Sequence, residues 1–179
     1  ARQAIALPSN VAFNAAVFNA VSASHELAPA LLTLGTNLSY GFLWNEIRAK
    51  RGAYGARAHY SLTNAAFSFS TYRDPCVTES LATFAQVFDH VTDTMDLSKE
   101  NVEQAVIGVV KNIDRPIRPA MAVETALTRH LHGITNEMRK LFRDRLLRLT
   151  GKQILKAVDE VLRPAFEKAA VCVVSSQAK

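Results

Sequence analysis

An arginine and a tyrosine lie close together between Leu43 and Arg57, where a helical pattern gives way to a strand pattern. Arg48 is near the end of the helical stretch, and Tyr54 follows it between two glycines. A guanidinium and a phenol can both donate hydrogen bonds to a carbonyl oxygen as it gains negative charge. An arginine near a helix end is also a common surface residue, and a tyrosine at a strand start commonly packs. The residues alone therefore make Arg48 and Tyr54 candidate catalytic residues and leave a structural role open.

The helix that must carry Arg48 has a clear apolar side, formed by Leu38, Phe42, Leu43 and Ile47. This spacing predicts that one side of the helix is buried. Cations at the end of a helix suit the negative end of its dipole. Gly52 follows as a residue suited to the left-handed conformation that ends many helices. We therefore predict a helix that ends at Gly52 and presents Arg48 outside the core.

Other kinds of chemistry find little support in the sequence. The five histidines contain no H-x-x-E-H arrangement, and His130 and His132 would point about 200° apart on a helix, too far to share an ion. Cys76 and Cys172 are too few for a disulfide framework or a four-ligand zinc site, so we expect reduced packing residues. No glycine-rich loop leads from a strand into a helix, as dinucleotide binding requires.

A basic stripe runs from residue 139 to residue 156 and contributes much of the formal charge of +5. Its cations are Arg139, Lys140, Arg143, Arg145, Arg148, Lys152 and Lys156. Such a stripe can bind nucleic acid or anionic lipid. Apolar residues share the same stretch and predict a core-facing side: Met138, Leu141, Phe142, Leu146 and Leu149. We therefore predict a solvated helix face, with neither nucleic acid nor membrane as a partner.

Five segments have strand patterns: 2–6, 11–18, 53–62, 65–73 and 169–174. The last segment is continuously apolar, which predicts a strand inside the sheet. Helical patterns begin at 24 or 25, with a bend or break expected at 35–39 before the helix of Arg48, and continue at 75–95, 98–112, 116–131, 135–148 and 151–163. We expect the run 105–110 to be deeply buried, with Gly108 at a close helix contact.

Alternation along the strands predicts one buried and one solvated sheet face. Phe67 and Phe69 alternate with Ser68 and Ser70, so the phenylalanines should face the helices. The segments 53–62 and 65–73 should form an antiparallel hairpin. If Arg57 and His59 are solvated, strict alternation would bury Tyr54. Either a bulge near Gly55 resets the alternation or Tyr54 lies just before the regular strand, and we favour the second because Gly52 and Gly55 bracket Tyr54.

Two motifs then indicate a family. The run Leu43-Trp44-Asn45-Glu46-Ile47-Arg48 to Gly52-Ala53-Tyr54-Gly55, followed by Ser70-Thr71-Tyr72-Arg73-Asp74-Pro75, resembles the C-terminal part of presequence-protease-like zinc metallopeptidases. These belong to the inverted-zincin clan, peptidase family M16, with insulysin and pitrilysin. The likeness covers most of the chain and includes the segment 128–135.

The resemblance implies an α+β fold, with a mostly antiparallel sheet, helices on one face and a substrate chamber on the other. It implies that Arg48 and Tyr54 contact the substrate carbonyl in trans to a zinc site carried by an N-terminal half. The full-length enzyme would hold zinc, whereas this segment would bind no metal and be inactive alone. The partners implied are a peptide substrate and the zinc-bearing half.

The length of 179 residues and a hydrophobic content of 49% favour a single domain over residues 1–179. The first residue is not methionine, which we interpret as a sign of a fragment from a longer multidomain chain. No run of about 18 apolar residues occurs. We expect an intracellular protein, in a bacterial cytoplasm or an organelle matrix.

Three functional hypotheses remain. The first is the substrate-contacting part of a zinc metalloendopeptidase that degrades short unstructured peptides. The second is a non-catalytic scaffold or interaction domain of the same fold, and the third is an anion-binding module that uses the basic stripe.

Overall fold

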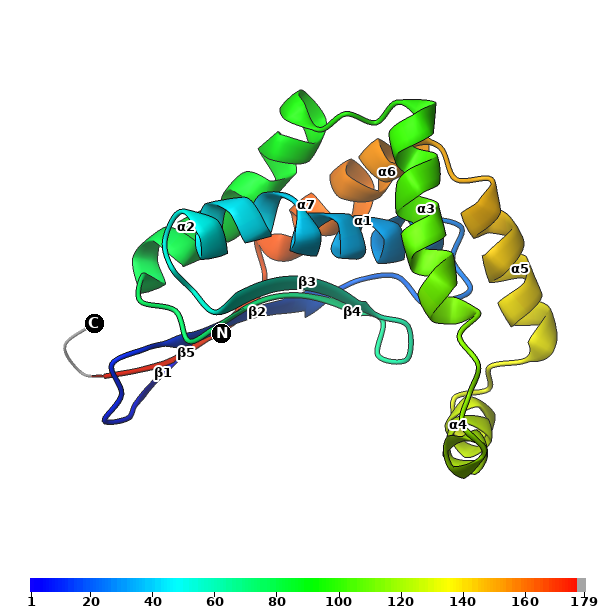
Figure 1. The fold of residues 1–179 in the computed structure, drawn as a ribbon, viewed down its shortest axis with the longest axis horizontal. Helices are drawn as coiled ribbons and strands as arrows, with labels where there is room; N and C mark the ends of the chain where they lie inside the picture. The colour runs from blue at the N-terminus through cyan, green and yellow to red at the C-terminus, as the bar shows by residue number, and fades with distance from the viewer. Residues whose placement is uncertain (177–179) are drawn as a thin grey trace.

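The computed structural model describes residues 1–176, which form a five-stranded sheet with helices on one of its faces (Figure 1). The strands are β1 (Arg2–Ala6), β2 (Phe13–Asn19), β3 (Gly55–Ser61), β4 (Ala66–Tyr72) and β5 (Ala170–Ser175). The α-helices are α1 (Ala28–Tyr40), α2 (Val77–Asp89), α3 (Lys99–Ile113), α4 (Pro119–Leu131), α5 (Asn136–Leu147), α6 (Gly151–Ala157) and α7 (Arg163–Phe166). Three π-helical turns complete the description: η1 (Trp44–Ala49), η2 (His90–Thr94) and η3 (Val158–Leu162).

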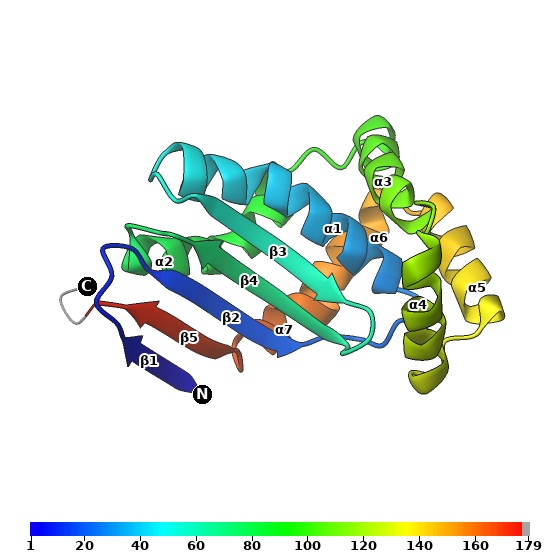
Figure 2. The same cartoon turned by 60° about the horizontal axis from the view of Figure 1, so that its bottom comes forward.

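The strands lie in the order β1-β5-β2-β4-β3 (Figure 2). The pairs β5–β2, β2–β4 and β4–β3 are antiparallel, whereas β1 runs parallel to β5. The α+β prediction with a mostly antiparallel sheet is therefore confirmed, with one parallel pair at the edge. The prediction that the C-terminal strand lies inside the sheet is also confirmed.

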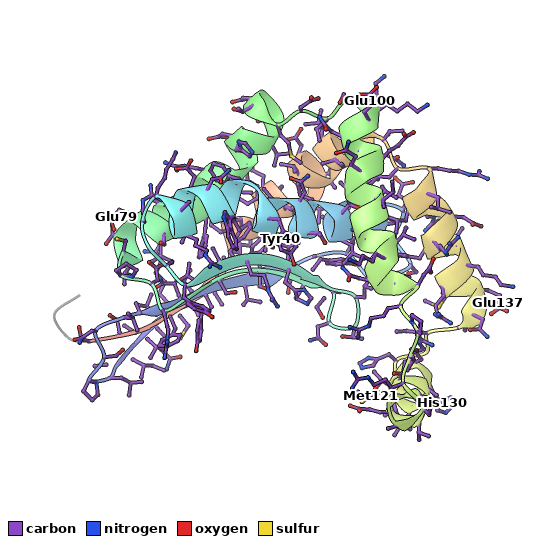
Figure 3. The ribbon with its side chains drawn as sticks, viewed as in Figure 1. Tyr40, Glu79, Glu100, Met121, His130 and Glu137 are labelled. Carbon is purple, nitrogen blue, oxygen red and sulfur yellow. The ribbon has the colours of Figure 1, made fainter. Side chains whose placement is uncertain are left out.

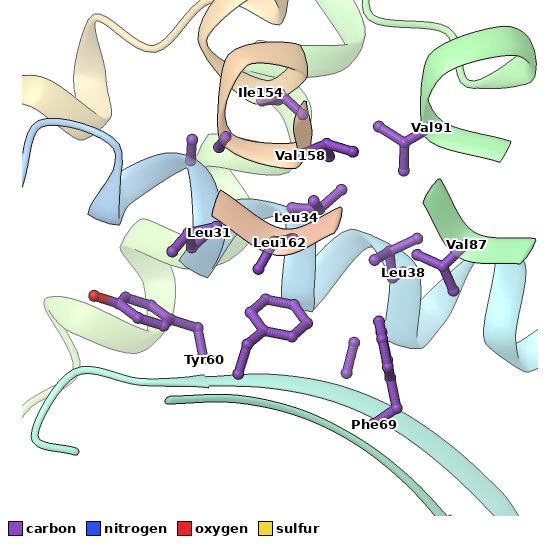
Figure 4. Packing of buried hydrophobic residues seen from close by; sticks show 14 of the residues in the cluster. Leu31, Leu34, Leu38, Tyr60, Phe69, Val87, Val91, Ile154, Val158 and Leu162 are labelled. Atoms are coloured by element: carbon purple, nitrogen blue, oxygen red, sulfur yellow. The ribbon is translucent and has the colours of Figure 1, made fainter. Parts of the chain in front are cut away.

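The hydrophobic core lies between the sheet and the helix layer (Figure 4). Phe67 and Phe69 of β4 are fully buried and face the helices, as the alternation predicted. Phe69 is surrounded by rings from several elements, among them Phe18 of β2 at 5.7 Å and Phe84 of α2 at 5.3 Å between centroids. From the helix layer, α1, α2 and α6 contribute apolar side chains to the same cluster, among them Leu31, Leu34, Leu38, Val87 and Ile154.

The predicted break at residues 35–39 is wrong, because α1 continues to Tyr40. Gly35 lies inside this helix, and a Cβ there would sit 3.4 Å from the carbonyl oxygen of Ala58 on β3. The glycine thus allows the helix to approach the strand and does not end it. Ser39 Oγ then contacts the same strand, accepting from the Ala58 N–H at 2.9 Å and lying 3.0 Å from the Ala58 carbonyl.

The two edges of the sheet differ in whether another element covers them. The main-chain groups of Ala58 point away from β4 and meet Ser39, so α1 covers the outer edge of β3 at this point. At the other edge, all five residues of β1 are exposed. The β3 edge is therefore covered by the protein itself, and the β1 edge faces solvent.

The prediction of burial is wrong for part of α3 and for one residue of α5. In α3, Val106 and Val109 are buried but Ile107 is 68% exposed, and a Cβ added to Gly108 would meet no atom within 4 Å. The core-facing side predicted for 138–149 is confirmed at Leu146, which is fully buried, and at Phe142 and Leu149, which pack against the core, but Leu141 of α5 is exposed. Both helices are packed along one narrow side, because each lies at the end of the helix layer with solvent around most of its surface.

α4 projects away from the helix layer, beyond the β3–β4 hairpin loop, and carries no buried residue (Figures 1 and 3). Its exposed apolar residues are Met121, Val123, Leu127 and Leu131. The helices of the main layer cover one face of the sheet, and within residues 1–176 no helix covers the opposite face.

Candidate functional site

The turn that carries Arg48 is fixed by buried apolar residues and by main-chain hydrogen bonds at its C-terminal end. Leu43 and Ile47 are fully buried. The Lys50 N–H donates to the Asn45 carbonyl at 3.1 Å, a bond over five residues that gives η1 its π-helical character. Gly52 adopts φ +80°, and the N–H of Ala53 returns to the Ile47 carbonyl at 3.3 Å. Gly52 therefore has the left-handed conformation predicted for it, although η1 itself ends three residues earlier, at Ala49.

Arg51 fixes this turn to the helix layer. Its Nη1 donates to the Glu46 carbonyl at 2.9 Å and to Thr83 Oγ1 of α2 at 2.8 Å. Arg51 is thus used for structure, and Arg48 is the arginine of this turn that faces the other way, toward Tyr54.

Arg48 lies between two aromatic rings. Its guanidinium carbon is 4.0 Å from the centroid of the Trp44 ring and 5.7 Å from that of the Tyr54 ring. Within residues 1–176 its guanidinium forms neither a hydrogen bond nor an ion pair. Contact with ring faces orients a guanidinium without using its N–H donors. The donors of Arg48 therefore remain available to a ligand.

Tyr54 immediately precedes β3, as the sequence predicted, and its side chain is 63% exposed. Its N–H donates to the Tyr72 carbonyl at 3.1 Å and contacts the Arg73 carbonyl at 3.3 Å. Its ring meets the Tyr72 ring edge to face, with centroids 5.7 Å apart. Tyr54 thus stands at the end of the open sheet face beside Arg48, and its hydroxyl has no partner within the described residues.

Sequence reasoning missed three residues around this pair. Trp44 precedes Arg48 by four positions, which is the spacing of neighbours on a helix surface, so that contact could have been found. Tyr72 supports the Tyr54 ring and in turn meets Phe13 of β2 at 5.3 Å. The contact between Tyr72 and Phe13 depends on the pairing of β2 with β4, which no local pattern reveals.

Arg73 ends this aromatic group in an unusual conformation. Its φ is +50°, in the left-handed region, and its guanidinium carbon lies 5.8 Å from the Tyr72 ring centroid. The next residue, Asp74, is fully buried, accepts from Asn14 Nδ2 at 3.1 Å and exchanges two main-chain hydrogen bonds with Ala12. Asp74 is thereby fixed to Ala12 and Asn14 by hydrogen bonds, whereas the Arg73 side chain lies against the Tyr72 ring.

The remaining candidate sites lie elsewhere. An open groove of about 710 Å³ lies between α4, α5 and the β3–β4 loop and shares no lining residue with the Arg48–Tyr54 site. Several cations of the basic stripe are engaged within the protein: Arg143 pairs with Asp114 at 2.8 Å, and Lys156 pairs with Glu26 at 2.8 Å. The absence of a nucleic acid partner stays a prediction.

No group of three or more His, Cys, Asp or Glu side chains within residues 1–176 is placed to hold a metal ion. The residues present therefore do not fit a resident zinc ion. In the same part of the chain, no helix is both long enough and apolar enough to span a bilayer.

A model of the family described as "PreP C-terminal domain" matches residues 2–177. The chain belongs to this family. This PreP C-terminal domain is 31% identical to "Presequence protease, mitochondrial" of Kluyveromyces lactis over 156 residues, which is 87% of this chain and 16% of that protein. It is 28% identical to "Presequence protease 1, chloroplastic/mitochondrial" of Arabidopsis thaliana over 162 residues, 89% of this chain and 15% of that protein. The domain thus spans about a sixth of the length of these relatives.

Solved structures share the fold of this PreP C-terminal domain. A protease from Helicobacter pylori aligns with a TM-score of 0.77 at 14% identity, over 97% of this chain and 43% of that one. A putative zinc protease from Bordetella pertussis Tohama I aligns with a TM-score of 0.75 at 16% identity, over 94% and 96%. The inactive peptidase domain of a putative zinc protease from Bordetella parapertussis gives 0.73 at 16% identity, over 94% and 92%. The resemblance stated from the sequence motifs is therefore confirmed for family and fold.

Proposed function

We propose that this domain is the substrate-contacting C-terminal part of a zinc metalloendopeptidase that degrades short unstructured peptides in a closed chamber. Arg48 and Tyr54 would contact the carbonyl of the peptide bond that is cleaved. The main support is that the Arg48 guanidinium carbon lies 5.7 Å from the Tyr54 ring centroid. Within the described residues, neither the guanidinium N–H groups nor the phenol O–H donates a hydrogen bond. The presequence protease names of the relatives support the same reading.

The chemistry of this pair is electrostatic. A carbonyl oxygen under nucleophilic attack gains negative charge, and donors that are already oriented stabilise that charge without reorganisation. Trp44 holds the guanidinium from one side, and Tyr72 holds the phenol ring of Tyr54. Both donors therefore need little further ordering when the substrate binds.

The domain would not act alone. The described residues do not offer a zinc site, so we propose that the zinc ligands belong to an N-terminal half of the complete enzyme, with this stretch as one domain of that longer chain. The names of the relatives place them in mitochondria or chloroplasts. We accordingly propose an organelle matrix or a bacterial cytoplasm for the complete enzyme.

Steady-state kinetics of the complete enzyme on an unstructured peptide test the roles of Arg48 and Tyr54. Arg48→Ala and Tyr54→Phe should each lower kcat by about a hundredfold to a thousandfold, with zinc content and thermal unfolding unchanged, because each removes one donor to the transition state. Arg48→Lys should restore activity only in part, since an ammonium lacks the planar fork.

Arg115→Ala and Tyr40→Phe are matched controls, because both side chains are exposed and neither forms a hydrogen bond or ring contact with Arg48 or Tyr54. Normal kcat and kcat/KM in both Arg48→Ala and Tyr54→Phe would refute the catalytic assignment. That result would favour the scaffold or interaction domain of the same fold.

A further inference from the structure

The pairing of β2 with β4 contains one extra residue at the end of β4. Ala15 of β2 lies opposite Ser70 of β4, so regular pairing would place Ala12 opposite Arg73. Ala12 instead lies opposite Asp74, and the two residues exchange main-chain hydrogen bonds of 2.8 Å in both directions. An extra residue on one strand of an antiparallel pair is a β-bulge, and bulges often redirect side chains beside active sites.

The extra residue is Arg73, and its backbone conformation is one that favours glycine. Its φ of +50° lies in the left-handed region, which is unfavourable for a residue with a Cβ. Such a conformation persists only where the surrounding structure enforces it. On one side Asp74 pairs with Ala12, and on the other the Tyr54 N–H lies 3.1 Å from the Tyr72 carbonyl and 3.3 Å from the Arg73 carbonyl. Tyr54 is therefore joined directly to the backbone of the bulge.

The carboxylate of Asp74 connects the bulge to β2 and to the start of α2. It is fully buried, and it accepts from Asn14 Nδ2 at 3.1 Å and from the Cys76 N–H at 2.9 Å. Asn14 is itself buried and also donates to Thr71 Oγ1 of β4 at 2.9 Å. Loss of a buried acceptor is costly because its donors are left without a partner. The Asp74 side chain therefore strengthens the main-chain pairing that forms the bulge.

The same hydrogen bonds fix Phe13 from both sides. Asp74 bonds to the main chain of the residue before Phe13 and to the side chain of the residue after it. The Phe13 ring meets the Tyr72 ring with centroids 5.3 Å apart, and the Tyr72 ring meets the Tyr54 ring at 5.7 Å. A continuous series of contacts thus leads from the Asp74 carboxylate to the phenol of Tyr54.

We propose that Asp74 is a positioning residue for Tyr54. It enforces the bulge at Arg73, and the bulge and the supporting rings orient the phenol toward a substrate carbonyl. The proposal rests on the proposed function, in which the phenol O–H donates to that carbonyl. Asp74 is fully buried, so it acts through Tyr54 and not by contact with a peptide. A small displacement of a donor removes much of its contribution to the transition state.

The test is a double-mutant cycle on kcat of the complete enzyme, with an unstructured peptide as substrate. Asp74→Asn keeps the shape of the side chain and removes its charge, so it should lower kcat by about tenfold with a smaller change in KM. In a Tyr54→Phe background the same substitution should change kcat by less than about twofold, because no phenol donor remains to be positioned. In an Arg48→Ala background it should again lower kcat by about tenfold.

Two further variants probe the same series of contacts. Arg73→Gly added to Asp74→Asn should restore part of kcat, because glycine adopts a positive φ without enforcement. Phe13→Leu removes a ring that is only partly buried, so the protein should fold, and its effects should resemble those of Asp74→Asn. Thr33→Val is the matched control, since it removes a buried hydroxyl that donates a 2.9 Å hydrogen bond within α1, and it should leave kcat unchanged.

Fluorine NMR gives a measurement that does not depend on turnover. A fluorotyrosine in place of Tyr54 of the complete enzyme reports the surroundings of the phenol ring. Its resonance should shift or broaden in Asp74→Asn and in Phe13→Leu, and it should stay unchanged in Thr33→Val.

Equal losses of kcat for Asp74→Asn in the wild-type and Tyr54→Phe backgrounds would overturn the proposal, because the carboxylate would then act through other groups. A fluorine resonance that neither Asp74→Asn nor Phe13→Leu changes would overturn it as well. Failure of the catalytic assignment has a different signature: Tyr54→Phe alone would keep the wild-type kcat, and the fluorine resonance would still decide whether Asp74 positions the ring.

Discussion

Arg48 owes its position to Trp44, one helical turn earlier. The guanidinium lies 4.0 Å from the indole centroid, and no carboxylate holds it. An ion pair would orient the arginine equally well but would occupy the donors that a substrate carbonyl needs. Contact with the indole face therefore orients the guanidinium and leaves its N–H donors available to a substrate.

Trp44→Leu should lower kcat of the complete enzyme by about tenfold with a smaller change in KM, because a loosely held donor loses part of its transition-state contact. Trp44→Phe should restore part of the activity, since a phenyl face also attracts a guanidinium. Equal rates for Trp44→Leu and wild type would show that Arg48 is positioned by other contacts.

At the scale of single residues, the sequence was sufficient for the local part of the site. Arg48, Gly52 and Tyr54 follow one another within seven positions, so helix periodicity and the glycine signal were enough to bring them together. Tyr72 and Phe13 are 59 positions apart, and their contact is fixed by the register of β2 against β4. Register is set by the packed core as a whole, so the support of Tyr54 was beyond the reach of local patterns.

At the scale of elements, Gly52 is the glycine whose backbone conformation the site requires. Gly52→Ala should lower the free energy of unfolding by roughly 1 kcal/mol, because φ is +80° and a Cβ is disfavoured there even without a clash. Gly108→Ala is the matched control: it lies inside α3 with open space around it, so alanine should raise stability by about 0.5–1 kcal/mol.

Urea-induced unfolding of the two glycine variants measures both changes. Opposite signs are expected. A stabilising Gly52→Ala would mean that the end of η1 does not depend on the left-handed conformation.

The wrong prediction in α1 has a physical cause at the same scale. Glycine in a helical pattern signals either a break or a close contact, and the local sequence is the same in both cases. Here α1 crosses β3 closely, and Ala58 lies opposite Gly35. Whether Gly35 ends the helix or allows a close contact therefore depends on β3, which lies more than 20 residues away in the sequence.

At the scale of the whole molecule, the partial burial of His90 leads us to predict that the free energy of unfolding is lower in acid. His90 stacks on Phe42 with ring centroids 4.3 Å apart, and burial lowers the pKa of its imidazole from the usual 6.5, although Glu46 opposes the shift. Between the lowered pKa and 6.5, the unfolded chain binds a proton that the folded chain excludes. The free energy of unfolding should therefore fall as the pH drops below 6.5.

His90→Phe keeps a ring against Phe42 and removes the titrating group. The difference in unfolding free energy between about pH 8 and about pH 5 should be smaller in this variant than in wild type. Comparison at the higher pH, where the histidine is neutral, serves as the control for packing. An identical pH dependence in both proteins would show that other groups cause the acid sensitivity.

The asymmetry of the sheet edges limits how copies of this domain can associate. Strand-to-strand growth into a filament needs two free edges on every copy. Ser39 Oγ accepts from the outward N–H of Ala58 and lies 3.0 Å from the Ala58 carbonyl, so α1 occupies the β3 side at that point. Within residues 1–176 the opposite edge is β1, so pairing of two such domains through β1 would leave only the β3 edges, which α1 covers at Ala58. The contact of α1 with β3 at Ser39 thus removes one of the two edges that continuous strand-to-strand growth would need.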